Sequence, residues 1–366
     1  MAYLRDYLIP QSKSKIKAGE GMQFGKYRFF TSSPIQSKYY DTATYDQPAL
    51  IFGTGGNASV HYCDEPFATS TDCLVMYGVK ESNLELIYHY LQTNLHLLQA
   101  GFKGAGLQHI SKEYILDISI DLPENNVQNH LLSEIRIIDS LIAARRNQLS
   151  KLDELVKSRF IEMFGDGKYS MKTLPQIITK DKHSLKRGPF GGALKKEDFV
   201  ENGYLVYEQR HAIHNDFEYE KYYITPKKYQ EMIMFKVVPG DLIISCSGVT
   251  LGRIAEIPSY AKEGIINQAL LKVTLDQSIM INTFFIHQFR SDRVQDILFG
   301  FCRGSGIPNF PSMSEVKAVE FICPPIELQN QFATFVEQVD KSKFEIQKSL
   351  EKLETLKKAL MQKYFG

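Results

Sequence analysis

Apolar side chains recur every three or four residues over two long stretches of the chain. In residues 123–165 the repeating positions begin at Leu131 and end at Met163, and in residues 324–366 they begin at Phe332 and end at Tyr364. Steps of three and four residues place side chains on one face of a helix. The pattern therefore predicts two long helices, each with an apolar seam of the kind found in coiled coils.

The two stretches are copies of one sequence. A shift of 201 residues aligns them without a gap and gives eleven identities over 43 positions. Pro123 falls on Pro324, and Gln128 falls on Gln329. A repeat of this length indicates internal duplication, so we expect pseudo-twofold symmetry.

Each seam carries two charged positions, and each of them is apolar in the other copy. The aligned pairs are Arg145 with Ile346, Arg159 with Leu360, Ile142 with Lys343 and Val156 with Lys357. We expect the helices to pack together, antiparallel, and to disfavour pairing with copies of themselves. Two unrelated amphipathic helices in separate cores are the alternative. The predicted helix-pair interface is Ile135, Ile142, Leu149, Leu152, Val336, Ile346, Leu350 and Leu353.

The regions outside the helices mix strand and helix patterns. Apolar and β-branched runs bounded by Gly, Pro, Asn and Ser predict strands, and one longer periodic run in each half predicts a helix. In the first half these are Ala49–Phe52, Cys73–Tyr77, Ile115–Ile120 and the helix Ser82–Ala100. In the second half they are Leu205–Tyr207, Asp241–Ser245, Leu270–Thr274 and the helix Thr283–Phe299.

The predicted fold class is therefore α+β, with two mixed α/β domains separated by two long helices. The expected parts are a first domain over residues 1–122, a helix over 123–166, a second domain over 167–322 and a helix over 323–366. A chain of 366 residues is long enough for two such domains and their cores.

Composition narrows the class of protein. No apolar run approaches the ~20 residues of a membrane span. The five cysteines form no closely spaced pair, which is typical of buried thiols in a reducing cytosol. The net charge is only +1, but basic residues crowd the start of each domain, over residues 13–28 and 172–196. Such clusters favour a nucleic-acid partner, although a solvated charged face is the simpler alternative.

Several motifs of the second half resemble one family. They are Ser184–Phe199, Val238–Gly248 with Gly252, Ile266–Gln268 and Pro324–Gln331 with Asp340 downstream. They are similar to motifs of the DNA-specificity subunit of Type I restriction-modification systems, and the resemblance covers essentially the whole chain. In the first half, Gly25–Thr31 and Ala49–Asn57 look like another subtype of the family's recognition domain.

The resemblance implies two target-recognition domains that each read one half of a split DNA site. It also implies two methyltransferase subunits as partners, which use S-adenosylmethionine to methylate adenine in the half-sites. Two motor-nuclease (restriction) subunits would complete the restriction complex. The chain itself would bind no cofactor.

The residues suggest where double-stranded DNA is bound. Glycine-flanked basic residues can neutralise a phosphate, and Arg, Asn and Gln can read purines with two hydrogen bonds. Small-polar loops at Thr54–Ser59 and Ser245–Thr250 suit either tight turns or contacts with base edges. The candidate residues are Lys26, Arg28, Thr54, Asn57, Lys103, Gln108, Lys186, Arg187, Arg210, Ser247, Arg253, Gln268 and Arg303. For any one of them a purely structural role is a serious alternative.

Catalytic motifs are missing from the sequence. Cys323–Ile326 lacks the flanking residues of an amino-methyltransferase motif, and Phe52–Gly56 is better explained as a turn than as a cofactor loop. The histidines have no metal-ligand spacing. We therefore expect no catalysis and no metal. The alternatives are a self-contained DNA methyltransferase, a coiled-coil adaptor that does not bind DNA, and an RNA-binding module.

Overall fold

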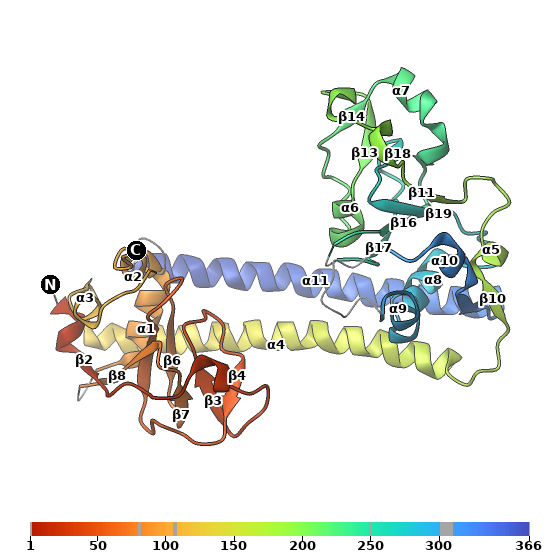
Figure 1. Cartoon of the computed structure of the whole chain (residues 1–366). Coiled ribbons are helices and arrows are strands. Elements are labelled where there is room, and N and C mark those ends of the chain that lie inside the picture. Colours follow the sequence, from red (N-terminus) through yellow and green to blue (C-terminus); the bar gives the residue numbers. More distant parts are fainter. Residues whose placement is uncertain (1, 80–81, 105–107, 249, 301–309, 366) are drawn as a thin grey trace. The chain divides into compact units, whose positions relative to one another are not determined.

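The computed structural model describes residues 2–79, 82–104, 108–248, 250–300 and 310–365 (Figure 1). It forms two compact units. The first joins Met1–Leu149 with Glu345–Gly366, and the second is Ser150–Phe344. Each unit therefore holds one globular domain and a segment of both long helices. The predicted boundaries of the four sequence parts stay a prediction, because these units divide the helices.

The long helices occupy equivalent positions in the repeat. Helix α4 is Asn125–Phe164 and helix α11 is Ile326–Phe365, each of 40 residues. Within the described residues, neither these nor any other helix is long and apolar enough to cross a membrane. The predicted α+β class with two long helices is confirmed.

Two identities of the repeat stabilise the start of each helix. The Gln128 amide donates a hydrogen bond to the carbonyl of Pro123 at 2.9 Å, and the Gln329 amide donates to that of Pro324 at the same distance. Each glutamine side chain thus holds the chain segment that enters its helix.

In the first unit the two helices run antiparallel. Lys357 pairs with Asp139 at 2.6 Å, and Glu354 pairs with Arg146 at 2.8 Å, so higher numbers in α4 meet lower numbers in α11. The side chains of Ile138, Ile142 and Leu350 are buried between them, with Leu149 and Leu353 partly buried.

In the second unit the helices are again antiparallel. Lys343 pairs with Asp153 at 2.5 Å, and the rings of Phe160 and Phe332 lie 5.4 Å apart. Both seam lysines of α11 therefore face an aspartate of α4. Of the remaining predicted interface residues, Ile135 and Val336 are buried in the cores of their units, while Leu152 and Ile346 are half-buried.

The last phenylalanine of each long helix enters a core. Phe164 packs against Phe284 with ring centroids 4.8 Å apart, and Phe365 packs edge-on against Tyr90 at 5.8 Å. The repeat matches Phe164 with Phe365, so the same aromatic residue fixes the end of each helix to a globular domain. The Asn94 amide also donates to the Phe365 carbonyl at 2.8 Å.

The main sheets of the two units share one topology. The order is β2-β8-β5-β6 in the first unit and β11-β19-β16-β17 in the second, and all pairs are antiparallel. The strands are β2 Leu8–Pro10, β5 Ala49–Gly53, β6 Val60–Cys63, β8 Cys73–Gly78, β11 Leu185–Arg187, β16 Leu242–Ser245, β17 Ile254–Glu256 and β19 Leu270–Val273.

A second sheet in each unit contains one parallel pair, β3–β7 or β13–β18. The strand orders are β4-β3-β7 and β12-β14-β13-β18-β15. The strands are β3 Tyr27–Phe30, β4 Lys38–Tyr40, β7 Phe67–Thr69, β12 Phe199–Val200, β13 Tyr204–Tyr207, β14 Tyr223–Ile224, β15 Lys236–Val237 and β18 Gly264–Ile266.

A two-stranded ribbon leads into each long helix, β1 with β9 before α4 and β10 with β20 before α11. The strands are β1 Ala2–Tyr3, β9 Ser119–Ile120, β10 Met171–Thr173 and β20 Glu320–Ile322. Every sheet of the first unit thus has a counterpart in the second, and the duplication extends beyond the helices.

Short helices complete the domains. They are α1 Leu84–Thr93, α2 Leu95–Gln99, α3 Lys112–Leu116, α5 Leu174–Ile177, α6 Gln209–His214, α7 Pro226–Glu231, α8 Asn282–Phe289, α9 Asp292–Phe299 and α10 Met313–Ala318. The 3-10 turns are η1 Leu4–Asp6, η2 Ala18–Glu20, η3 Gly191–Ala193, η4 Lys196–Asp198 and η5 Ile233–Phe235.

Three element predictions need correction. The helix expected over Ser82–Ala100 is interrupted at Asn94, and the helix expected over Thr283–Phe299 is interrupted at Arg290 and Ser291. The run Ile115–Ile120 was expected to be a strand, but its first residues end α3 and only its last two form β9. The Ser111 hydroxyl caps α3 by accepting from the Tyr114 nitrogen, which favours the helix locally.

Candidate nucleic-acid interface

The two small-polar loops singled out in the sequence are equivalent hairpin loops, one in each unit. In the first, between β5 and β6, the Gly53 nitrogen donates to the Ser59 carbonyl at 3.1 Å. In the second, between β16 and β17, the Ser245 nitrogen donates to the Arg253 carbonyl at 2.8 Å. The same backbone frame thus presents two different sets of side chains.

Each hairpin loop is also bonded to the loop that precedes the neighbouring strand. The Thr54 nitrogen donates to the Asp72 carbonyl at 2.9 Å, and the Cys246 nitrogen donates to the Ala269 carbonyl at 2.8 Å. Gln268, which precedes Ala269, is exposed beside the second hairpin. The candidate interface of each unit is therefore formed by several adjoining loops.

In the first unit, the candidates around the hairpin differ in exposure. Thr54 is buried and its hydroxyl donates to the Asp72 carbonyl at 2.9 Å, so it holds the loop in place. Asn57 is exposed in the hairpin loop. Lys103 and Gln108 are exposed on a second loop, which meets the hairpin through the bridge between Gly55 and His109.

Two further candidates of the first unit lie at β3. Lys26 is exposed and its ammonium lies 5.1 Å from the centre of the Tyr27 ring. Arg28 is half-buried and pairs with Glu65 at 3.2 Å and with Asp64 at 3.9 Å. Its charge is already neutralised in this conformation, which makes Arg28 a weaker candidate than Lys26.

The start of the chain offers cations that the candidate residues did not include. Lys13, Lys15 and Lys17 are exposed and form no ion pair within the part of the chain that the structure describes. The Ile16 carbonyl between them accepts from the Thr71 nitrogen at 2.9 Å, next to the residue that bonds the hairpin. The basic run over residues 13–28 indicates this region in the sequence. The sequence alone does not show which of its cations form ion pairs.

In the second unit, Lys186 and Arg187 lie on opposite faces of the sheet because they are consecutive in β11. The Lys186 ammonium lies 5.3 Å from the centre of the Phe235 ring. The Arg187 guanidinium lies 5.4 Å from that of Phe190 and 5.1 Å from that of Phe310. The two cations therefore cannot serve one phosphate together.

Three more candidates surround the second hairpin. The Ser247 hydroxyl donates to the Gln209 amide oxygen at 3.0 Å, which joins the hairpin to α6. Arg253 is exposed at the rim of a 310 Å³ pocket that Arg290 also lines. Arg210 pairs with Asp216 at 3.4 Å and lies over the Tyr219 ring. Arg303 lies outside the described residues.

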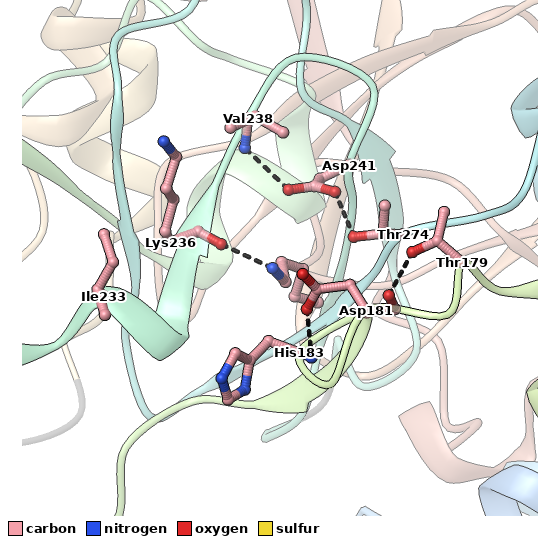
Figure 2. A pocket seen from close by; sticks show the side chains of 10 residues that line it. Thr179, Asp181, His183, Ile233, Lys236, Val238, Asp241 and Thr274 are labelled. Carbon is pink, nitrogen blue, oxygen red and sulfur yellow. Dashed lines mark hydrogen bonds between the residues drawn. The ribbon is translucent and has the colours of Figure 1, made fainter.

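A pocket of 330 Å³ lies in the second unit (Figure 2). Its lining residue Lys272 pairs with Lys186 between β19 and β11, so the pocket is on the Lys186 face of the main sheet. Figure 2 shows the Asp241 carboxylate, which accepts from the Val238 nitrogen at 2.8 Å and from the Thr274 hydroxyl at 2.5 Å. The buried Lys272 ammonium donates to the Lys236 carbonyl at 2.8 Å, and burial lowers its pKa. These bonds stabilise the turn before β16.

Two other pockets occupy equivalent places, one in each unit, where both long helices meet a helix of the domain. Their volumes are 480 and 500 Å³. Residues matched by the 201-residue shift line both. In the first they are Asp139, Ile142, Glu354, Lys357, Lys358, Met361 and Gln362, and in the second Asp340, Lys343, Asp153, Val156, Lys157, Phe160 and Ile161.

Each of these pockets also contains a histidine of a domain helix. His89 of α1 lines the first and His287 of α8 lines the second. Burial lowers the pKa of each to about 4, assisted by the nearby Lys357 for His89 and by Arg290 for His287. The location of the pocket, one aspartate and one lysine therefore recur in the two units, whereas Ile142 and Lys357 of the first pocket are matched by Lys343 and Val156 of the second.

The chain thus consists of two like units, each with a hairpin loop of its own side chains and a segment of both long helices. The family model for the Type I restriction modification DNA specificity domain matches residues 8–153 and 190–358. The chain therefore belongs to this family, and the resemblance inferred from its motifs is confirmed.

Comparison with an individual protein supports the same family. The chain is 24% identical over 190 residues to the Type I restriction enzyme EcoDI specificity subunit of Escherichia coli. The aligned part is 52% of this chain and only 37% of that protein.

Two solved structures share the fold. One is the S subunit of a Type I restriction-modification system from M. genitalium, with 15% identity and a TM-score of 0.62 over 100% of this chain and 95% of that one. The other comes from work on complex assembly and conformational transition of the type I R-M system, with 12% identity and a TM-score of 0.55 over 100% and 96%. At such identities the likeness shows the fold alone.

Proposed function

We propose that the chain is a Type I specificity subunit that binds a bipartite double-stranded DNA target, with one globular domain for each half-site. The equivalence of the two hairpin loops is the observation that carries this proposal. One frame presents Asn57 and the other presents Ser247 and Arg253, so the same surface can read different bases.

The proposed partners are two methyltransferase subunits, which would bind S-adenosylmethionine and methylate adenine in the half-sites. Two restriction subunits would join them in the full complex. The repeated pockets support a partner that is present twice, because each offers the same acid, from Asp139 or Asp340, and the same lysine, from Lys358 or Lys157.

In this proposal the chain supplies recognition and catalyses no reaction. The state of its buried thiols supports that role. Burial raises the pKa of Cys73 and of Cys246 to about 12, which disfavours the thiolate that a nucleophile requires. Within the described residues, no group of three or more His, Cys, Asp and Glu could hold a metal ion.

Co-expression with the cognate methyltransferase subunits tests the proposal, with sequencing of the methylated adenines as the readout. We expect a motif of two short blocks separated by a spacer of unspecified bases. Asn57→Ala should relax only one block, and Arg253→Ala only the other. Methylation of an undivided motif, or methylation that does not depend on the chain, would overturn the proposal.

A further inference from the structure

Arg187 lacks the partners that a half-buried arginine normally has. Its side chain donates no hydrogen bond and joins no ion pair within the described residues, and its Nε is buried without a partner. The other arginine candidates of this unit differ, since Arg210 pairs with Asp216 and Arg253 is exposed. Unpaired buried donors cost free energy, so a ligand that accepts from Arg187 would recover it.

Two aromatic rings hold the guanidinium in place. It lies 5.4 Å from the centre of the Phe190 ring and 5.1 Å from that of Phe310. Phe310 is buried, with 8% of its surface exposed, whereas Phe190 is 69% exposed. Contact with ring faces restricts the orientation of the guanidinium without occupying its N–H donors. Arg187 is therefore preorganised for an acceptor.

The position of Arg187 is at the edge of the candidate interface. The next residue, Gly188, donates from its nitrogen to the Leu270 carbonyl at 2.9 Å, just beyond Gln268. The positive charge of Arg187 is also close enough to Cys246, the first residue of the second hairpin loop, to oppose the rise in the pKa of its thiol. Arg187 thus adjoins both loops.

The chemistry favours a base edge over a phosphate. A phosphate contact requires no fixed plane, and exposed lysines on flexible stems are sufficient for it. A guanidinium with a fixed plane and a free donor fork matches the two acceptors, O6 and N7, that guanine presents in the major groove. The exposed Phe190 ring can contact the apolar part of a neighbouring base.

From these contacts we infer that Arg187 reads a guanine in the half-site bound by the second unit, with Phe190 as the side chain that positions it. This inference rests on the proposed function. It applies to one half-site only. In the first unit, continuing the β2–β8 register to Leu74 places Ser12 at the position equivalent to Arg187, which pairs with Leu271.

The test compares Arg187→Lys, Arg187→Ala and Phe190→Leu in the complex with the methyltransferase subunits. Arg187→Lys keeps the charge but loses the planar fork. We expect discrimination at one G·C pair of one half-site to fall roughly ten- to hundredfold, with the other half-site unchanged. Phe190→Leu should relax the same position less. Arg293→Lys is the matched control, because that guanidinium donates to the Glu320 carbonyl instead.

Methylation motifs and binding to duplexes that differ at single base pairs separate the outcomes. An unchanged motif with equal loss of affinity for all duplexes would identify a phosphate contact and overturn the inference. An unchanged motif with unchanged affinity would also overturn it. If the melting temperature shows that the Arg187→Ala protein does not fold, the inference is tested with the Arg187→Lys and Phe190→Leu variants. A wild-type complex without sequence preference would refute the proposed function itself.

Discussion

At the scale of single residues, Gly188 is where two backbone segments touch. A Cβ on this residue would come within 1.8 Å of the Asn267 carbonyl oxygen. Because the obstacle is backbone, a Gly188→Ala protein must shift the strand or the loop, and we expect a lower melting temperature by several degrees. Gly19→Ala is the control, since no atom lies within 4 Å there. Equal melting temperatures of the two variants would contradict the close approach of Gly188 to the Asn267 carbonyl.

Free lysines at the start of the chain should govern the salt dependence of DNA binding. We expect the combined change Lys13→Gln, Lys15→Gln and Lys17→Gln to weaken binding to specific and random duplexes alike. The slope of log affinity against log salt should become shallower by up to about 0.9 for each phosphate that the variant no longer neutralises. Lys341→Gln, whose lysine pairs with Glu337 at 2.8 Å on α11, should not change it. An altered motif with an unchanged slope would indicate base contacts.

Residue roles were harder to predict from the sequence than residue positions. The polar loops were correctly found, but composition could not show that Thr54 is buried in the loop while Asn57 is exposed. Nor could it show that Glu65, 37 residues away, neutralises Arg28. Exposure and ion pairing depend on contacts between distant segments, which local patterns do not contain.

At the scale of elements, Gln329 joins the start of α11 to the second domain. It is fully buried, its amide donates to the carbonyls of Ile279 and Pro324, and its oxygen accepts from the Ile281 nitrogen at 2.9 Å. Gln329→Leu leaves these groups unpaired, so we expect a loss of about 3 kcal/mol in the free energy of unfolding. Denaturant unfolding measures it.

The equivalent Gln128 provides the comparison. It is only half-buried, so Gln128→Leu should cost less than Gln329→Leu. A larger loss for Gln128→Leu would show that water does not replace the hydrogen bonds of this partly exposed glutamine.

His89, which is buried, and His287, which is half-buried, should make the fold sensitive to acid. The pKa of His89 and of His287 is about 4 in the folded chain, against about 6.5 when unfolded. Below pH 6.5 the unfolded state binds protons that the folded state excludes. Stability is therefore retained above pH 6.5 and lost as the pH falls toward 4, by up to roughly 3 kcal/mol for each histidine.

Replacing both histidines tests whether they cause the acid sensitivity. The double variant His89→Asn and His287→Asn should lose less stability than the wild type between pH 6.5 and 4, as measured by denaturant unfolding at each pH. His130→Asn is the control, because the His130 side chain is 75% exposed. An identical pH profile in the double variant and the wild type would show that other groups cause the acid sensitivity.

Long periodic elements could be predicted from the sequence, whereas short ones could not. The helical period of the apolar residues and the internal repeat together predict the ends of α4 and α11 to within a few residues. The periodic run around α1 gave no sign of the break at Asn94, because that break is stabilised by the Phe365 carbonyl, 271 residues away. The short strands β3, β4 and β7 have too few residues for a reliable period.

At the scale of the whole molecule, the duplication gives both units the same architecture. The sheet order, the hairpin frame, the start of each long helix and the adjoining pocket all recur. What does not recur are the side chains of the hairpin loops and the charges of the seams. The repeated parts hold the structure, while the variable parts would let the two domains bind different half-sites in the proposed function.

The distance between the two proposed half-sites should depend on the length of the helix pair. From the sequence we expect the helix pair to set it, because about 35 helical residues at ~1.5 Å span roughly 50 Å, or about 15 base pairs. The compact units divide after Leu149 in α4 and after Phe344 in α11. Inserting seven residues at both places therefore leaves each unit intact and keeps the seam in register, since seven is one heptad.

The inserted turns lengthen each helix by about 10 Å, so the spacer between the half-sites should grow by up to roughly three base pairs. The half-site sequences should stay the same because neither hairpin loop is altered. An insertion of four residues should be worse than one of seven, since it rotates the seam away from its partner. Methylation mapping with the cognate methyltransferase measures the spacer. An unchanged spacer in a folded, active variant would assign the distance to the partner subunits.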